Sequence, residues 1–194
     1  MRDGKHIAID RPCKMGLRNI IKKGESTLAK KSRVIKDFNE RLHTLLDDMR
    51  ETMLEAKGLG LAAPQVGVLR RAVLVVDTTE EEDRIIELIN PEIIESEGLQ
   101  EGPEGCLSVP DVWGIVKRPM NVKVRAQDRY GKEFEIEAEG LTARAFCHEI
   151  DHLNGTLFTD ICERILTPEE VEELFFSEEN DEENDQADTE TEKV

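Results

Sequence analysis

The stretch Phe-Cys-His-Glu-Ile-Asp-His-Leu-Asn-Gly at residues 146–155 contains the string HEIDH, and the rest of the chain is organised around it. On a helix with about 3.6 residues per turn, His148 and His152 lie one turn apart on the same face, so both imidazoles can bind one metal ion. Glu149 lies beside them and can carry protons. The stretch therefore predicts a helix that holds a metal site with its own acid–base group.

Two histidines leave a catalytic metal one ligand short, because such sites usually have about three protein ligands and an open position. The metzincin pattern HExxHxxGxxH is matched through Gly155, but Phe158 occupies the place of its third histidine. A thermolysin-like site would use a downstream glutamate, and residues 169–173 contain four. His6 and His43 lie in no motif. Cysteine is the remaining donor type, and its thiolate suits a soft divalent ion better than a carboxylate does.

Among the four cysteines, Cys106 has a distinctive setting, Glu-Gly-Cys-Leu-Ser at residues 104–108. Residues 101–103, Glu-Gly-Pro, are expected to form a flexible segment just before it. Upstream, residues 58–65 read Gly-Leu-Gly-Leu-Ala-Ala-Pro-Gln. These two strings and HEIDH, in this order, closely resemble the motifs of the peptide deformylase family, and the resemblance extends from about residue 15 to residue 166.

The resemblance implies a metal-dependent hydrolase that removes the formyl group from the N-terminal formylmethionine of newly made polypeptides and releases formate. It implies that Cys106, His148 and His152 bind one divalent metal ion per chain. Two imidazoles and a thiolate suit zinc by affinity. Deformylases as a family typically use ferrous iron, so Fe²⁺ is the expected ion, with Zn²⁺, Ni²⁺ or Co²⁺ as substitutes.

The catalytic residues implied by the resemblance are Glu149, Gln65 and Leu107. Glu149 would take a proton from the attacking water and deliver it to the departing amine. The Gln65 side chain and the Leu107 backbone N–H would stabilise the oxyanion that forms in the transition state. Glycine at position 60 would let the backbone approach a ligand, because any Cβ there would intrude. The residues expected to form the substrate site are Gly58, Gly60, Leu141 and Ala145.

Two alternatives remain open from the residues alone. One is an HExxH metallopeptidase with a glutamate of residues 169–173 as third ligand, and the other is a catalytically silent module that binds metal or peptide. The presence of Glu149 and Gln65 argues against the second. Cys147 is a departure, since many deformylases carry glutamine there; it points about 100° away from His148 and is expected to pack rather than bind metal. Asp151 is expected to make a structural contact.

The predicted fold class is α+β, with mixed or antiparallel sheets packed around a central HExxH metal-binding helix. Apolar residues at steps of three and four predict an N-terminal amphipathic helix over residues 37–57, which Gly58 is expected to end. Strands are predicted over residues 71–77 and 84–90, a shorter strand over residues 91–97, and a hairpin over residues 121–139. Thr-Pro-Glu-Glu at residues 167–170 is a capping box that predicts a short C-terminal helix.

The length of 194 residues and the 38% apolar content fit one domain with tails. Residues 1–14 are interpreted as an N-terminal extension that is flexible or was added artificially, and residues 15–166 as the catalytic domain. The short C-terminal helix covers residues 167–176, and an acidic disordered tail covers residues 177–194. No signal peptide or membrane span is predicted, and four irregularly spaced cysteines do not suggest disulfides, so we expect a cytoplasmic protein.

Charge is concentrated at the C-terminal end. Residues 169–194 contain 13 acidic residues and one lysine, which is net −12 of the −17 carried by the whole chain. Such a segment repels phosphate, so no direct nucleic-acid binding is expected, and no membrane partner either. The expected partners are N-formylmethionyl nascent peptides, met near the ribosome.

Overall fold

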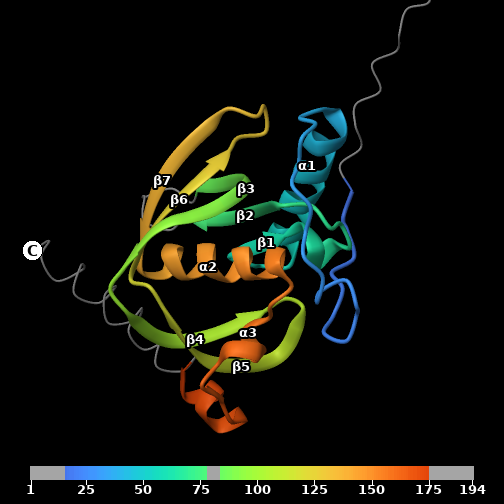
Figure 1. Ribbon diagram of the computed structural model, residues 1–194. Helices are drawn as coiled ribbons and strands as arrows, with labels where there is room; N and C mark the ends of the chain where they lie inside the picture. The colour runs from blue at the N-terminus through green and yellow to red at the C-terminus, as the bar shows by residue number, and fades with distance from the viewer. Residues whose placement is uncertain (1–15, 78–83, 175–194) are drawn as a thin grey trace, which may run out of the picture.

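A computed structural model describes residues 16–77 and 84–174 of the chain. The helix α2, Gly140–Asn154, lies between a five-stranded sheet and a smaller three-stranded sheet (Figure 1). Expectations for residues 1–14 and for the acidic tail fall outside the described residues. No helix within the described ranges is long and apolar enough to cross a membrane. The α+β class with a central metal-binding helix is confirmed.

The N-terminal amphipathic helix is α1, Glu40–Glu55, which is shorter than predicted at both ends. Asn39 caps it, because its side chain accepts hydrogen bonds from the backbone N–H groups of the first turn. At the other end, the residue in the left-handed conformation is Lys57, with φ of 52°, and not Gly58. Gly58 instead lies close to another part of the chain, since a Cβ there would lie 2.7 Å from the Leu107 side chain.

The larger sheet has the strand order β1-β2-β3-β6-β7, and all its neighbouring strands are antiparallel. The predicted hairpin is confirmed as β6 and β7, which pair in register along their whole lengths. The strands are β1 (Gly60–Ala62), β2 (Ala72–Asp77), β3 (Arg84–Glu97), β6 (Asn121–Gln127) and β7 (Glu133–Glu139).

The strand β2 is apolar on both faces because a helix covers each face. Successive side chains of a strand point to opposite sides of the sheet. Ala72, Leu74 and Val76 therefore pack in the cluster that contains α1. Val73 and Val75 pack in the cluster that contains α2. This double coverage explains why the strand reads as a continuous apolar run rather than as an alternation.

The helix α2 is oriented by its own apolar face. Phe146, Ile150 and Leu153 are buried against the larger sheet, so the histidine side of the helix faces the smaller sheet. Gly155 ends the helix in the left-handed conformation, with φ of 80°. A Cβ on Gly155 would lie 2.8 Å from the backbone of Ala29, so this end of the helix is pressed against the N-terminal segment.

The smaller sheet contains the strand that carries Cys106. The expectation of a flexible segment at residues 101–103 is wrong, because these residues belong to β4 and pair with β5. Gly-Pro reads as a turn signal, but β4 is an edge strand of this sheet, where a proline without an N–H is tolerated. The elements on this side are β4 (Gln100–Cys106), β5 (Val109–Arg118), β8 (Arg164–Ile165) and the short helix α3 (Phe158–Ile161).

The predicted capping box at the last helix is confirmed. The Thr167 backbone N–H donates to Glu170 Oε2 at 2.8 Å, and the Glu170 N–H donates to Thr167 Oγ1 at 3.3 Å. The helix that follows covers residues 168–174 of the described chain. A second short helix, the 3₁₀ helix η1 (Ala63–Val66), follows β1 and carries Gln65.

One asparagine fastens the larger sheet to the N-terminal segment. Asn90 interrupts β3 in the left-handed conformation, with φ of 53°, where the pairing register with β6 shifts. Its Nδ2 donates to the Ile35 carbonyl at 2.8 Å and to Gln127 Oε1 at 2.7 Å. Its Oδ1 accepts from the Ile35 N–H at 2.8 Å. Asparagine tolerates this conformation better than most residues, so one side chain serves both the turn and the contact.

We expect Asn90→Ala to lower the unfolding free energy by about 2–4 kcal/mol, because three hydrogen bonds are lost and alanine is strained at positive φ. Thermal unfolding should show a decrease in Tm of several degrees. Asn90→Gly is the control, since it removes the same hydrogen bonds without the strain and should fall between alanine and wild type. A Tm for Asn90→Ala equal to that of wild type would contradict this account.

Candidate metal centre

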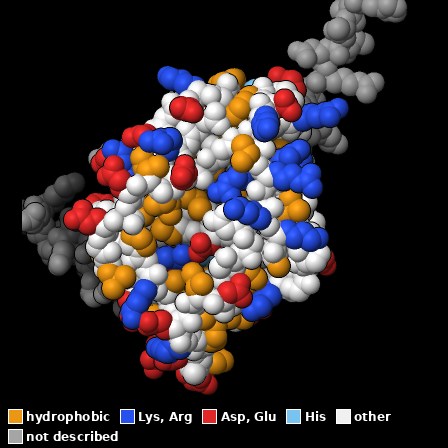
Figure 2. Space-filling model, viewed as in Figure 1, with side chains coloured by type: hydrophobic (Ala, Val, Ile, Leu, Met, Phe, Trp, Pro, Cys, Tyr) orange, Lys and Arg blue, Asp and Glu red, His pale blue; other side chains and the backbone are white. Residues whose placement is uncertain are grey.

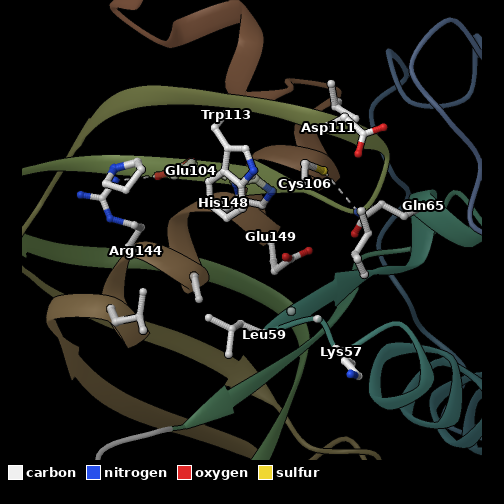
Figure 3. A pocket seen from close by; sticks show the side chains of 18 residues that line it. Lys57, Leu59, Gln65, Glu104, Cys106, Asp111, Trp113, Arg144, His148 and Glu149 are labelled. Atoms are coloured by element: carbon white, nitrogen blue, oxygen red, sulfur yellow. Dashed lines mark hydrogen bonds and ion pairs between the residues drawn. The ribbon is translucent and has the colours of Figure 1, made fainter. Parts of the chain in front are cut away.

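Three donor atoms converge between α2 and β4. Single ligand atoms of Cys106, His148 and His152 all lie within 4.8 Å of one another, and no other such group of three occurs in residues 16–77 and 84–174. The Cys106 Sγ lies 3.3 Å from His152 Nε2. The helix supplies the two imidazoles and the end of the strand supplies the sulfur. Figure 3 shows His148 and Cys106 on these two elements. The structure thus brings the three predicted ligands together.

The donor set fits a divalent transition metal. A thiolate and two imidazoles suit Zn²⁺ and similar ions. His148 Nδ1 is engaged by Glu104 at 3.0 Å, which leaves Nε2 of the same ring for a metal. The buried Glu149 Oε2 has no hydrogen-bond partner among the described residues. A buried carboxylate oxygen without a partner is costly unless an ion or a water completes the site.

The groups around His148 and His152 favour a positive charge at the donor cluster. Burial alone would lower the pKa of His148, but its hydrogen bonds to Cys106 and Glu104 outweigh burial and raise the pKa to about 10. Burial lowers the pKa of His152, so this imidazole is neutral and its lone pair is available. The cluster therefore attracts one positive charge, which a bound metal cation would supply in place of a proton.

Glu149 is held against the backbone of β1. The side chain is buried, and burial is the main reason that its pKa is raised to about 7. A Cβ built on Gly60 would lie 2.8 Å from the Cγ and Cδ of Glu149. Gly60 lines the cavity, as expected for a residue near a ligand, and the structure adds a second reason for glycine, since a Cβ would collide with this carboxylate. Gly60 thereby sets the position of Glu149 relative to the two histidines.

Gln65 is a buried polar side chain that points into the site (Figure 3). Its Oε1 accepts a hydrogen bond from the Ala62 N–H at 2.7 Å, which fixes the orientation of the amide. Its Nε2 therefore faces the site and lies 3.5 Å from Cys106 Sγ and 3.3 Å from Ser108 Oγ. Leu107 lies in the tight turn between β4 and β5, directly after the cysteine, and its carbonyl accepts from Lys22 Nζ at 2.7 Å.

A cavity of about 430 Å³ opens beside the three donors. Hydrophobic side chains gather in a hollow at the middle of the face shown in Figure 2. One wall is the segment that links α1 to β1, and the other is formed by β4 and β5. Leu141 is half-exposed at the mouth. All four residues predicted for substrate binding, Gly58, Gly60, Leu141 and Ala145, line this cavity, together with Trp113 and Arg144.

A buried ion network behind His148 was not predicted from the sequence. The Glu104 carboxylate accepts hydrogen bonds from His148 Nδ1 at 3.0 Å, from Arg118 Nε at 2.8 Å and from Arg144 Nη1 at 3.0 Å. Burial alone would raise the pKa of Glu104, but the bonds from His148 and Arg118 lower it to about 2. Glu104 belongs to the Glu-Gly-Cys-Leu-Ser string, which was the only signal for it in the sequence. Its partners could not be found in the same way, because they come from elements distant in sequence.

The structural contact expected for Asp151 is an ion pair with this network. Asp151 Oδ2 accepts from Arg118 Nη1 at 2.6 Å. The packing expected for Cys147 is also observed, because the thiol is buried in the apolar cluster of the larger sheet, where burial raises its pKa to about 11. Cys147 is not part of the donor group. Phe158, which replaces the third histidine of the metzincin pattern, stacks on the His148 ring with centroids 6.2 Å apart.

The alternative third ligand in residues 169–173 is wrong. The Glu170 carboxylate is bound to Arg164 Nη1 at 2.8 Å and accepts from the Thr167 N–H, and none of these glutamates joins the donor group. His43 Nε2 lies 2.9 Å from the carbonyl of Arg129, away from the site. His6 lies outside the described residues.

Comparisons with known proteins agree with the geometry. The family profile described as polypeptide deformylase matches residues 17–166. A peptide deformylase from Caldicellulosiruptor bescii is 58% identical over 159 residues, which are 82% of this chain and 93% of that protein. A solved peptide deformylase from Legionella pneumophila is 44% identical with a TM-score of 0.72, covering 80% of this chain and 89% of the other.

A third relative was solved with a peptide bound. It is a class I type b peptide deformylase from Acinetobacter baumannii in complex with Met-Ala-Ser. It is 35% identical to this chain with a TM-score of 0.72, and the match covers 76% of this chain and 99% of that one.

We expect Glu104→Gln to weaken metal affinity by about 10- to 100-fold, because the charged partner that orients His148 is lost. Competition between the protein and a chromophoric chelator for Co²⁺ measures this affinity. Asp151→Asn is the matched control: it removes one partner of Arg118 but does not touch His148, so it should lower Tm without changing metal affinity. Equal metal affinities for Glu104→Gln and wild type would show that Glu104 is structural only.

Proposed function

Because this chain belongs to the polypeptide deformylase family, we infer that its metal centre removes the formyl group from the N-terminal formylmethionine of nascent polypeptides. The observation that carries this conclusion is the convergence of Cys106, His148 and His152 beside a buried glutamate. The reaction breaks the bond between the formyl carbon and the amide nitrogen, and water supplies the oxygen and protons of formate and the free amine.

We propose that Cys106, His148 and His152 hold one Fe²⁺ ion, with Zn²⁺, Ni²⁺ or Co²⁺ as functional substitutes. When bound, such an ion supplies Lewis acidity that polarises the carbonyl and acidifies water. Iron is proposed on family grounds, since the donor set by itself also suits zinc. The Glu104 contact occupies Nδ1 of the His148 ring, so Nε2 would be the atom that binds the ion.

Glu149 is proposed as the general base and then the general acid. Its carboxylate comes from the residue after His148 and lines the cavity, so it reaches a water and a leaving amine in the same place. Contact with the Gly60 backbone restricts the carboxylate to this position. Its buried oxygen without a partner is available to accept the proton.

Gln65 and Leu107 are proposed to stabilise the oxyanion. The contact of Gln65 Oε1 with the Ala62 N–H leaves the Nε2 donor directed toward the cysteine sulfur before any substrate is bound. The Leu107 N–H follows the cysteine in the chain and would be a second donor. Donors that are already oriented need no rearrangement when charge develops, which is why they lower the barrier.

The peptide is proposed to lie in the 430 Å³ cavity, with the methionine side chain against Leu141 and Ala145. Gly58 and Gly60 form the opposite wall, and their backbone is close to Leu107 and Glu149. Little space remains for a substituent on the acyl carbon. Formyl carries only hydrogen there, whereas the methyl of an acetyl group would disturb the alignment for attack.

The wider assignments follow from this function. We propose that residues 15–166 form the catalytic domain, in agreement with the extent of the family match, and that residues 1–14, 167–176 and 177–194 are additions to it. We also propose that the enzyme works in the cytoplasm near the ribosome, where formylated N-termini emerge.

Glu149→Gln should retain the metal and lose formate release from formyl-Met-Ala-Ser by roughly 10²- to 10⁴-fold, because the amide cannot carry the proton. Metal analysis and formate release are measured on the same anaerobic sample. The wild-type enzyme with acetyl-Met-Ala-Ser is the substrate control and should show nearly no hydrolysis. Activity of Glu149→Gln near that of wild type would remove Glu149 from the mechanism.

Gly60→Ala should lower kcat by about 100-fold with unchanged metal content. The new Cβ would push the Glu149 carboxylate out of its place, and misalignment of a catalytic group costs rate. Gly16→Ala is the matched control, since a Cβ on Gly16 meets nothing within 4 Å. An effect of Gly60→Ala on KM alone would indicate that the glycine serves substrate binding, as the sequence had suggested, rather than the position of Glu149.

A further inference from the structure

A second cavity, of about 670 Å³, lies beside the start of α1 and shares no lining residue with the metal centre. Four cationic side chains line it, Arg33, Lys36, Arg41 and Arg70, and we call this site the basic cleft. Asp37 is the single acidic residue among its lining residues. The apolar part of the lining comes from Val34, Ile35, Leu42, Leu45 and Val68.

Carboxylates do not neutralise the four cleft cations, although they neutralise several other arginines and lysines of the described residues. The chain has 43 acidic and 26 basic residues, so partners are abundant. Lys117 pairs with Glu163, and Arg129 pairs with Asp47. Within the described ranges, by contrast, no side chain of the four cleft cations makes a hydrogen bond or an ion pair.

The backbone holds two of these charges, Arg33 and Arg70, side by side. Arg33 and Arg70 are partners in an isolated parallel β-bridge, in which the Arg33 N–H donates to the Leu69 carbonyl at 3.1 Å. Two residues on, the Ile35 backbone is clamped by Asn90, and the Ile35 side chain is buried in the core. Like charges on a rigid frame repel one another, and an anion bound between them relieves that repulsion.

The cleft belongs to a basic side of an acidic molecule. Residues 16–41 contain eight Lys and Arg against three Asp and Glu, although the whole chain carries −17. In Figure 2, Lys and Arg side chains gather on the side where α1 and the segment before it lie in Figure 1. The net charge of the chain therefore does not describe the potential at this surface.

We propose that the basic cleft binds the phosphate backbone of RNA. Three of the four cations are arginines, whose planar guanidinium groups bind phosphate in a bidentate manner. Binding releases counterions from the nucleic acid, which gives affinity without sequence preference. The choice of RNA rests on the proposed function, because formylated nascent peptides emerge from ribosomes, whose surface is rich in RNA. Binding at this cleft would be direct contact with nucleic acid, which the acidic C-terminal end of the sequence did not lead us to expect.

The test uses the full-length metal-loaded enzyme and a labelled oligouridine, with binding followed by fluorescence anisotropy. Four phosphate contacts predict a slope of log K against log salt of about −3, and an affinity loss of about 50-fold between about 50 and 200 mM salt. A variant with all four cleft cations replaced by glutamine should lose this binding. A matched control replaces four cations that already pair with carboxylates, Lys117, Lys123, Arg125 and Arg164, and should bind RNA as tightly as wild type.

Formate release from formyl-Met-Ala-Ser is measured for each protein and should be unchanged in both variants, so the RNA result is independent of the proposed catalysis. Equal RNA binding by the cleft variant and the matched control would overturn the proposal. Polyglutamate of equal charge serves as a competitor. If it displaced oligouridine at a lower concentration of charge than unlabelled oligouridine does, the cleft would be a site for acidic peptides and the RNA assignment would be wrong.

Discussion

A carboxylate buried between two guanidinium groups and an imidazole connects the metal centre to the fold. Glu104 on β4 accepts hydrogen bonds from Arg118 on β5 and from Arg144 and His148 on α2. Each of these charges would be unfavourable if buried alone, and removal of one partner from such a group typically costs about 3–5 kcal/mol. The network therefore fixes the smaller sheet and the helix relative to each other. That placement brings Cys106, two residues beyond Glu104, next to the histidines.

The helix α2 serves the larger sheet and the metal centre with different faces. Its apolar residues Phe146 and Leu153 are buried in the core of the larger sheet, whereas His148 and His152 face β4. Because the core face is tightly packed, the helix cannot rotate without moving buried side chains out of contact. The donor geometry is therefore maintained by packing that lies on the opposite side of the helix. Packing also fixes the position of Glu149, because the β1 backbone at Gly60 and the carboxylate fit together only if residue 60 has no Cβ.

Charged side chains are paired in the interior of the protein, whereas the cations of the basic cleft near α1 have no such partners among the described residues. Inside, cations and carboxylates neutralise one another around the metal centre, as in the contacts of Arg118 with Glu104 and Asp151. On the surface near α1, by contrast, Arg33 and Arg70 are neighbours without carboxylate partners in the described chain. The acidic residues are concentrated at the C-terminal end of the sequence. A protein of strongly negative net charge can therefore present a surface suited to a polyanion.

The sequence by itself determined the features that depend on residues a few positions apart in the chain. The spacing within HEIDH placed His148 and His152 on one helix face, and Thr167 with Glu170 predicted a capping box that the structure contains. Family motifs added Cys106, but no local pattern could show that residues 101–103 form a strand, because their partner in β5 is selected by packing. The partners of Glu104 and the carboxylate that Gly60 accommodates were likewise decided only by the tertiary structure. These contacts join residues about 14 to 89 positions apart, and their energy comes from burial and charge pairing that exist only once the elements have assembled.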